Sequence, residues 1–304
     1  MLGLTFLRWL LSPLFNRIRR LFVPYLLRRG ESRYPRLSLS VHRLTAGTVL
    51  KRRKAYRLRP EADAMQFLSQ KRLSTPIPVP RLIDYWENDE EGYLVMEYIE
   101  GERLLRVWRN LSSEQHAHVI RTIAGYVEAL RSIPQPLPPS LPSAGWIGSA
   151  SGGPFTDLAV TWSQVALGPF PSQASFNDWH MSLFDIFARE SAKTAARVAE
   201  KRREMRDDHP IVFTHGDINM ENVLVRVHGE GPEDVEIVAL LDWEQSGWWP
   251  LYWEAMKWLW LTRRSPVMDA WREFGWKVLS GGYEDDARRE FELFEISGTP
   301  PDVD

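Results

Sequence analysis

Three polar side chains whose types suit metal-assisted chemistry, Asp217, Asn222 and Asp242, stand at the ends of short apolar runs. The runs are Ile211–Phe213, Val223–Val225 and Ile237–Leu241. Each run is bounded by glycine or polar residues and is rich in β-branched or aliphatic residues, which predicts three buried strands. Catalytic side chains are commonly carried on the segments that follow strands. The sequence therefore predicts that two carboxylates and one carboxamide meet at the strand ends of one small sheet.

These side chains suit phosphoryl transfer. In phosphate-binding sites Mg²⁺ takes oxygen ligands from one or two carboxylates and from the substrate phosphates. Asn222 and Asp242 can supply such ligands, which leaves Asp217 to orient an attacking hydroxyl group and to accept its proton. A metallohydrolase is disfavoured because the chain has no H-E-x-x-H and no cysteine. In addition, His116 and His118 are two residues apart and do not share a helix face.

Two motifs in this region resemble those of a known family. His215, Asp217 and Asn222 form H-x-D-x-x-x-x-N, which is similar to the catalytic loop of protein-kinase-like enzymes. Leu-Leu-Asp-Trp-Glu at 240–244 resembles the metal-binding segment of the aminoglycoside phosphotransferase family. The following G-W-W-P-L-Y-W-E, residues 247–254, is similar to the fungal branch of that family.

The resemblance covers residues ~40–265 and implies an α+β, two-lobed protein-kinase-like fold. ATP would lie between a small β-rich lobe and a larger, mainly helical lobe. We expect a basic, apolar leader at 1–35, the small lobe at 36–98, the large lobe at 99–296 and a polar tail at 297–304.

Within the small lobe, Lys51 and Glu61 are expected to form an ion pair. The family's strand-borne lysine points to Lys51, on a predicted strand Thr48–Lys51, as the residue that holds the nucleotide phosphates. The alternative is a solvated surface cluster, because residues 51–54 are a run of basic residues. A helix that begins near Glu61 would place this glutamate on the same inward face as Met65. A buried glutamate needs a cation, and Lys51 would provide it.

The segment Met96–Gly101 resembles the hinge between the two lobes. Backbone groups near Glu97 and Ile99 would hydrogen-bond adenine there. One departure from the pattern is that no G-x-G-x-x-G precedes Lys51, where Gly47 stands alone. This departure keeps a catalytically inactive relative in consideration.

Three further segments carry structural predictions. Ser112 and Gln115 form a capping-box pattern and predict a helix that begins after Ser112. The glycine-rich stretch 146–155 predicts a surface loop. Pro250 suits the first position of a helix, whose aromatic residues would belong to the core.

Charge is distributed unevenly along the 304 residues, whose formal net charge is −2. Residues 1–60 hold 15 Lys and Arg and one acid, Glu31. Residues 1–30 combine apolar residues at helical spacing with arginines that exclude a clean membrane span. Three interpretations stay open: an amphipathic helix on an anionic membrane, an organelle-targeting segment, or a leader packed on the domain.

The absence of cysteine excludes disulfides and thiol catalysis and is compatible with a reducing compartment. We expect a cytoplasmic protein, with membrane association or organelle targeting added if the leader acts in either way. Nucleic acid is not an expected partner, because no recognised nucleic-acid-binding module is present. The sequence does not indicate an oligomeric state.

The function predicted from these residues is transfer of the γ-phosphate of ATP, with Mg²⁺, to a hydroxyl group of a small molecule. Asp217 is expected to be the catalytic base, and Asn222 and Asp242 the metal ligands. Lys51, paired with Glu61, is expected to position the nucleotide. The alternative is a catalytically inactive kinase-like protein that binds a ligand or a partner.

Two neighbouring features refine this prediction. Protein kinases usually carry a lysine two residues after the catalytic aspartate, where this chain has Asn219, and no Ala-Pro-Glu follows Asp242. Both features disfavour a protein substrate. We interpret His215 as a structural residue that braces the catalytic loop.

Overall fold

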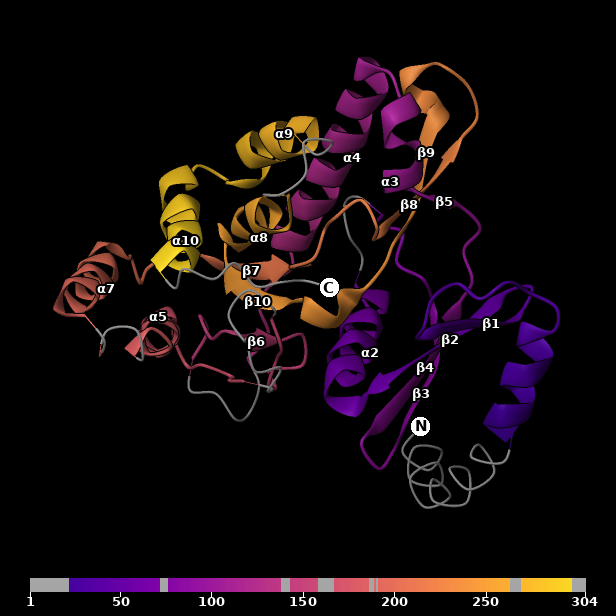
Figure 1. Ribbon diagram of the computed structural model, residues 1–304, viewed down its shortest axis with the longest axis horizontal. Helices are drawn as coiled ribbons and strands as arrows, with labels where there is room; N and C mark the ends of the chain where they lie inside the picture. Colours follow the sequence, from indigo (N-terminus) through magenta and orange to yellow (C-terminus); the bar gives the residue numbers. More distant parts are fainter. Residues whose placement is uncertain are drawn as a thin grey trace.

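The computed structural model describes residues 22–71, 76–137, 143–157, 167–185, 189, 191–262 and 269–296. Residues 1–21 of the leader and the tail 297–304 lie outside these ranges. The described chain forms two lobes, a sheet with one long helix and a larger, mainly helical part (Figure 1). This arrangement confirms the predicted α+β, two-lobed fold.

The small lobe is built on a four-stranded antiparallel sheet in the order β1-β2-β4-β3. Its strands are β1 (Val41–Thr45), β2 (Thr48–Lys54), β3 (Leu82–Asn88) and β4 (Glu91–Glu97). A helix over residues 22–31 lies beside β1, and helix α2 (Ala55–Ser69) packs near β4 (Figure 1). Lys51 of β2 pairs with Leu94 of the central strand β4, so its side chain starts from the middle of the sheet.

Helix α2 begins at Ala55, six residues before the start predicted near Glu61. Proline is disfavoured in a helix interior because it lacks the N–H that the interior needs. Here Pro60 lies inside the helix. The buried side chains of Leu58, Ala62 and Met65 pack in the core, and their burial outweighs one missing backbone hydrogen bond.

The large lobe contains two three-stranded sheets. One has the order β5-β8-β9, from Glu102–Arg103, Val223–Val227 and Val235–Leu240. The other has the order β6-β10-β7, from Gly148–Ser149, Gly247–Pro250 and Ile211–Thr214. The three apolar runs are therefore strands, as predicted, but the prediction that they share one sheet is wrong. The first run pairs with β10, whereas the other two pair with each other.

The helices of the large lobe surround these sheets (Figure 1). They include α3 (Leu104–Val107), η1 (Trp108–Asn110), α4 (Ser113–Arg131), α5 (Gln173–Ser182), α7 (Ala192–Glu204), α8 (Trp253–Thr262), α9 (Asp269–Leu279) and α10 (Glu284–Ile296). Ser112 and Gln115 form the predicted capping box of α4, with a Gln115 N to Ser112 Oγ distance of 3.2 Å. No helix within the described residues is long and apolar enough to cross a membrane.

Two predictions about the large lobe are wrong. The stretch 146–155 is largely buried, because Gly148 and Ser149 form an edge strand on β10 and Trp146 has no exposed surface. The cause is its aromatic residues, whose burial outweighs the loop preference of its glycines. Pro250 ends strand β10, and helix α8 begins three residues later, at Trp253.

Candidate active site

The segment between β7 and β8 holds the predicted catalytic motif. Gly216 adopts a left-handed backbone conformation, with φ of +77°. The backbone N–H groups of His215 and Gly216 donate to the buried carboxylate of Glu254, at 2.9 Å and 3.2 Å to its Oε2 atom. The start of α8 therefore fixes the turn that carries Asp217.

His215 braces this segment, as predicted. Its Nδ1 accepts a hydrogen bond from the N–H of Asp217 at 3.2 Å, and its Nε2 donates to the carbonyl of Leu241 at 3.2 Å. Burial lowers the pKa of His215 to about 4, so the imidazole is neutral and can donate and accept at once. One ring thus joins the catalytic segment to the residue before Asp242.

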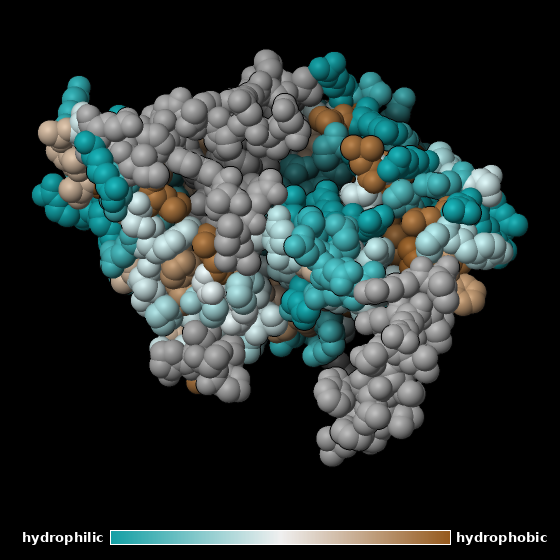
Figure 2. Space-filling model, turned by 60° about the horizontal axis from the view of Figure 1, so that its bottom comes forward, coloured by the Kyte–Doolittle hydropathy of each residue, from teal (hydrophilic) through white to brown (hydrophobic). Residues whose placement is uncertain are grey.

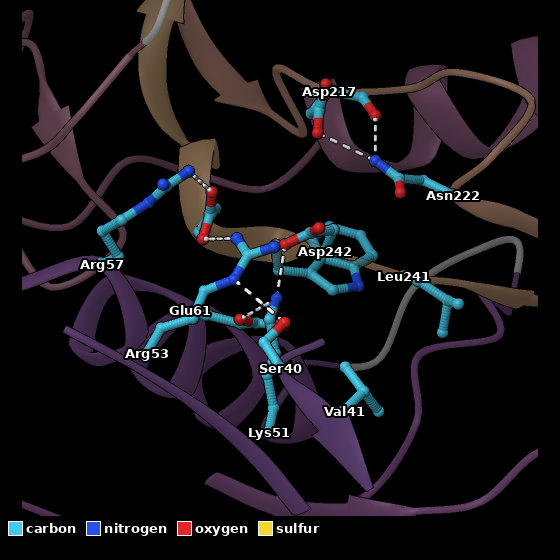
Figure 3. A network of polar contacts seen from close by, with 12 residues as sticks. Ser40, Val41, Lys51, Arg53, Arg57, Glu61, Asp217, Asn222, Leu241 and Asp242 are labelled. Carbon is cyan, nitrogen blue, oxygen red and sulfur yellow. Dashed lines mark hydrogen bonds and ion pairs between the residues drawn. The ribbon is translucent and has the colours of Figure 1, made fainter. Parts of the chain in front are cut away.

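Asp217 is held by two amide side chains. Asn222 Nδ2 donates to Asp217 Oδ2 at 2.8 Å, and Asn219 Nδ2 donates to Oδ1 at 3.2 Å. Burial, with repulsion from Asp242, raises the pKa of Asp217 to about 8, while Lys257 acts in the opposite direction. The Asn222 amide nitrogen is directed to Asp217, which leaves its amide oxygen for a cation (Figure 3).

Asp242 follows β9 and caps the short helix η3 (Trp243–Gln245) in a left-handed conformation, with φ of +66°. Such a conformation is uncommon for a residue other than glycine and is often found at functional sites. The N–H of Leu241 donates to the carbonyl of Asn222 at 2.8 Å. The two residues predicted as metal ligands, Asn222 and Asp242, therefore lie on adjoining segments (Figure 3).

Lys51 joins the two lobes. Its Nζ lies 2.7 Å from Glu61 Oε2, which is the predicted ion pair, and 2.6 Å from Asp242 Oδ1. Burial alone would lower the pKa of Lys51, but attraction to the surrounding carboxylates outweighs burial and raises it. Lys51 therefore stays charged, and the alternative of a solvated surface lysine is wrong, because only 3% of its surface is exposed.

A second group of charges lies beside this contact. Glu244, on η3, accepts hydrogen bonds from Arg53 Nη1 of β2 at 2.9 Å and from Arg57 Nη2 of α2 at 2.5 Å. We call Arg53, Arg57 and Glu244 the interlobe clasp. Figure 3 shows both arginines reaching from the small lobe across to the segment that carries Asp242.

The donor set decides where a divalent cation fits. Carboxylate oxygens of Glu61, Asp242 and Glu244 lie within 4.8 Å of one another. However, Lys51 and the two clasp arginines already balance these three negative charges. Asp242 with the amide oxygen of Asn222 is the better pair, because the two residues lie on adjoining segments beside Asp217 and their oxygens are of the kind that Mg²⁺ prefers.

The hinge residues have distinct backbone partners. The N–H of Glu97 donates to the carbonyl of Arg81 at 3.0 Å, and that of Tyr98 donates to the carbonyl of Gly47 at 3.0 Å. Among the described residues, the N–H of Ile99 makes no such backbone bond. Ile99 can therefore donate to a ligand, whereas the N–H of Glu97 is already used within the small lobe.

Sequence reasoning missed Arg53 and Arg57 and left Glu244 and Glu254 without roles. Arg53 lies two residues after Lys51 and so points to the same face of β2. That spacing was a usable signal, obscured by the run of basic residues. The buried pair of Lys257 and Asp157, with an Nζ to Oδ1 distance of 2.8 Å, had no local sequence signal.

The fold of this chain resembles solved structures of aminoglycoside phosphotransferases. Among solved structures, the fold is similar to that of aminoglycoside phosphotransferase APH(2'')-Ib with bound ADP, with a TM-score of 0.55, 15% identity, and 86% of this chain and 82% of the other covered. The ternary complex of APH(2'')-IIa with streptomycin and ATP is similar with a TM-score of 0.55 and 15% identity, and the match covers 86% of this chain and 80% of the other. APH(3'')-Id from Streptomyces rimosus, bound to ADP and streptomycin, is similar with a TM-score of 0.50 and 18% identity, and the match covers 91% of this chain and 98% of the other.

These identities are low, so the structural likeness shows the fold. A search of curated protein sequences gave no significant match. Resemblance to the fungal branch therefore stays a prediction. The family itself is shown by sequence, since residues 33–291 match the model of a family described as "Phosphotransferase enzyme family". The chain belongs to this family of phosphotransferases.

Proposed function

We propose that this protein is an ATP- and Mg²⁺-dependent phosphotransferase that acts on a hydroxyl group of a small molecule. One observation carries the proposal: the hydrogen-bonded pair of Asp217 and Asn222 lies beside the ion pair of Lys51 and Asp242. These side chains come from both lobes and include a base, two oxygen donors for a metal and a cation for phosphate (Figure 3). Family membership supports the same reaction class.

The residues divide the work of such a reaction. Bound ATP and Mg²⁺ would supply the electrophilic phosphoryl group and neutralise its charge. Asn222 and Asp242 would hold the metal, and Lys51, kept in place by Glu61, would contact the phosphates. The N–H of Ile99 and the carbonyl of Glu97 are the proposed contacts for adenine.

Asp217 is the proposed catalytic base. It would accept the proton of the acceptor hydroxyl as the new O–P bond forms and the bond to the β–γ bridging oxygen breaks. Asn219 and Asn222 hold its carboxylate, which restricts the directions from which a hydroxyl can approach. The neutral His215 keeps the backbone of Asp217 in place and does not take part in the proton transfer.

Nucleotide binding is the first test. ATP at about 100 times its Kd should add roughly 2.7 kcal/mol to the free energy of unfolding, in a manner that depends on Mg²⁺. In Asp242→Asn the Mg²⁺-dependent part should be lost. The same titration with GTP tests the choice of nucleotide. If ATP with Mg²⁺ does not stabilise a cooperatively unfolding wild-type protein, the proposal is wrong and the protein is better described as a non-catalytic binding protein.

Phosphate transfer is the second test. A panel of small alcohols, beginning with aminoglycosides because streptomycin is bound in two of the similar structures, would be screened for acceptor-dependent ADP release. Asp217→Asn should retain nucleotide binding and lose at least about a hundredfold in transfer rate. Transfer unchanged in this variant would remove Asp217 from the base role.

A further inference from the structure

The helix over residues 22–31 is attached to the small lobe through one face only. Gly30 is buried on that face, and a Cβ atom there would lie 2.2 Å from the carbonyl oxygen of Arg43 in β1. The absence of a side chain thus lets the helix approach the strand backbone. Leu27 and Val23, one and two turns earlier at helical spacing, are partly buried. The face that packs on the small lobe is therefore apolar and already buried in part.

The adjoining face of the helix is also apolar, and nothing in the described structure covers it. Phe22 and Tyr25 are each 57% exposed, and Leu26 is 38% exposed. Their spacing of three and four residues places them on one stripe, which we call the outward stripe. A surface helix of a soluble domain normally has polar residues on this side. An apolar stripe directed away from the core indicates a second environment that is apolar as well.

The charges next to the outward stripe are positive. Arg29 continues the stripe one turn after Leu26, and Arg28 and Arg33 flank it, all exposed. Within residues 22–36 the one acid is Glu31, whose Oε1 lies 3.1 Å from His42 Nδ1. Figure 2 shows one face of the molecule, on which small hydrophobic patches are set among mostly hydrophilic side chains. Apolar side chains beside exposed arginines match the boundary between lipid tails and anionic headgroups.

We propose that the outward stripe and its arginines bind the surface of an anionic phospholipid membrane. Phe22, Tyr25 and Leu26 enter the headgroup region, and Arg28, Arg29 and Arg33 contact lipid phosphates. The helix lies on the membrane and does not cross it, since no described helix is long and apolar enough to span one. A nucleic acid would use the arginines and leave three apolar side chains in water, so a membrane is the better occupant.

Vesicle binding by the full chain tests this proposal. The protein is mixed with phosphatidylcholine vesicles that contain phosphatidylserine, and with phosphatidylcholine vesicles alone, and the bound fraction is measured by flotation. We expect binding to the first and little to the second, with an affinity that falls as salt rises. Arg29→Glu/Arg33→Glu should lower the affinity by at least roughly fivefold per arginine. Phe22→Ser/Leu26→Ser should abolish the salt-resistant part of the binding.

Matched variants of the large lobe serve as controls. Arg109→Glu/Arg121→Glu makes the same change in net charge at exposed positions, and Leu137→Ser/Val227→Ser removes two other exposed apolar side chains. Both should bind vesicles as the wild type does, and all variants should melt at the wild-type temperature. The proposal is overturned if phosphatidylserine vesicles do not bind the wild type, or if the helix variants bind as well as the controls. The proposal is likewise overturned if the protein binds vesicles that lack phosphatidylserine and if inorganic phosphate or DNA abolishes that binding.

Discussion

Arg53 Nη1 lies 2.9 Å from Glu244 Oε2, although the two residues are 191 positions apart in the chain. The contact joins strand β2, which carries Lys51, to the turn that begins with Asp242. Arg57 adds a second bond from α2, the helix that carries Glu61. The interlobe clasp therefore fixes, from outside, the same two segments that Lys51 joins from inside.

Glu244→Gln should weaken this junction. The change keeps the shape of the side chain and removes the negative charge that the two arginines share, at a site where Glu244 is 4% exposed. Because the arginines are partly exposed, we expect a loss of about 1–3 kcal/mol in the free energy of unfolding. Urea unfolding measures the loss, and a titration with ATP should show a weaker affinity.

Glu221→Gln is the control for this change. Glu221 pairs with Arg103 at the surface, where both side chains are more than 40% exposed. Removing that charge should cost less than about 1 kcal/mol and leave the affinity for ATP unchanged. Equal stability losses in the two variants would mean that the interlobe clasp is an ordinary surface contact.

The contrast between Lys51–Glu61 and Arg53–Glu244 shows what local sequence can predict. Lys51 and Glu61 lie on consecutive elements, and the inward face of α2 requires a cation for Glu61, so their pairing follows from periodicity and burial. Arg53 finds its partner across the lobes, 191 residues away. No pattern within one element contains that information, since it depends on how the lobes are placed together.

The sheets of the large lobe show the same limit. Strand positions for β7, β8 and β9 follow from short apolar runs, but the runs do not state which strands pair. Strand β7 pairs with β10, a segment that was predicted to begin a helix at Pro250. The hydrophobic content of Trp248 and Trp249 suits either a buried strand or a buried helix, and tertiary packing decides between them.

His215 should make stability depend on pH in the acid range. Its folded-state pKa, about 4, lies below the ordinary 6.5. Its contribution is therefore present above pH 6.5 and is lost as pH falls toward 4, because the unfolded chain binds the proton first. Between about pH 7.5 and about pH 5 this loss is about 2 kcal/mol. Over the same range, the free energy of unfolding of His215→Gln should fall by about 2 kcal/mol less than that of the wild type. Urea unfolding measures both.

The same substitution at His228 separates this effect from a general one. The side chain of His228 is 59% exposed and lies outside the site. His228→Gln should therefore follow the wild-type pH profile. If His215→Gln and the wild type lose equal stability between these pH values, the neutral, bridging state of His215 is contradicted; the comparison must be made with this variant because Asp217, whose pKa is raised to about 8, changes stability in the opposite direction.

Gly216→Ala should destabilise the catalytic turn. A Cβ atom at Gly216 would lie 2.8 Å from the carbonyl oxygen of Gln245, and the residue has a φ of +77°. The left-handed conformation alone costs an alanine about 1–2 kcal/mol, and the close contact adds to it.

Gly125→Ala is a control of opposite sign, because this glycine lies within α4 and its added Cβ would meet nothing within 4 Å. That change should stabilise the protein by about 0.5–1 kcal/mol. A thermal melt that ranks the two variants in the reverse order would contradict the described backbone at Gly216.

Lys257 and Asp157 should show strong energetic coupling. Their side chains are completely buried, and Lys257 Nζ also donates to Gln245 Oε1 at 2.8 Å, while Trp253 Nε1 donates to Asp157 Oδ2 at 3.3 Å. Removing one partner leaves a charge in the core, so Lys257→Met should cost about 3–5 kcal/mol. The double variant Lys257→Met/Asp157→Asn should lose clearly less than the sum of the two single losses.

The Lys54–Glu90 contact provides the comparison for this cycle. Its Nζ to Oε2 distance is also 2.8 Å, but both side chains face solvent, at 48% and 84% exposure. Burial is thus the main difference between the two pairs, and water should remove most of the coupling at the exposed pair. Urea unfolding of the four proteins in each cycle gives both coupling energies. If the two cycles agree, burial does not strengthen the Lys257–Asp157 pair, and α8 must be held against the catalytic turn by apolar packing and by the bonds of Glu254 to the backbone.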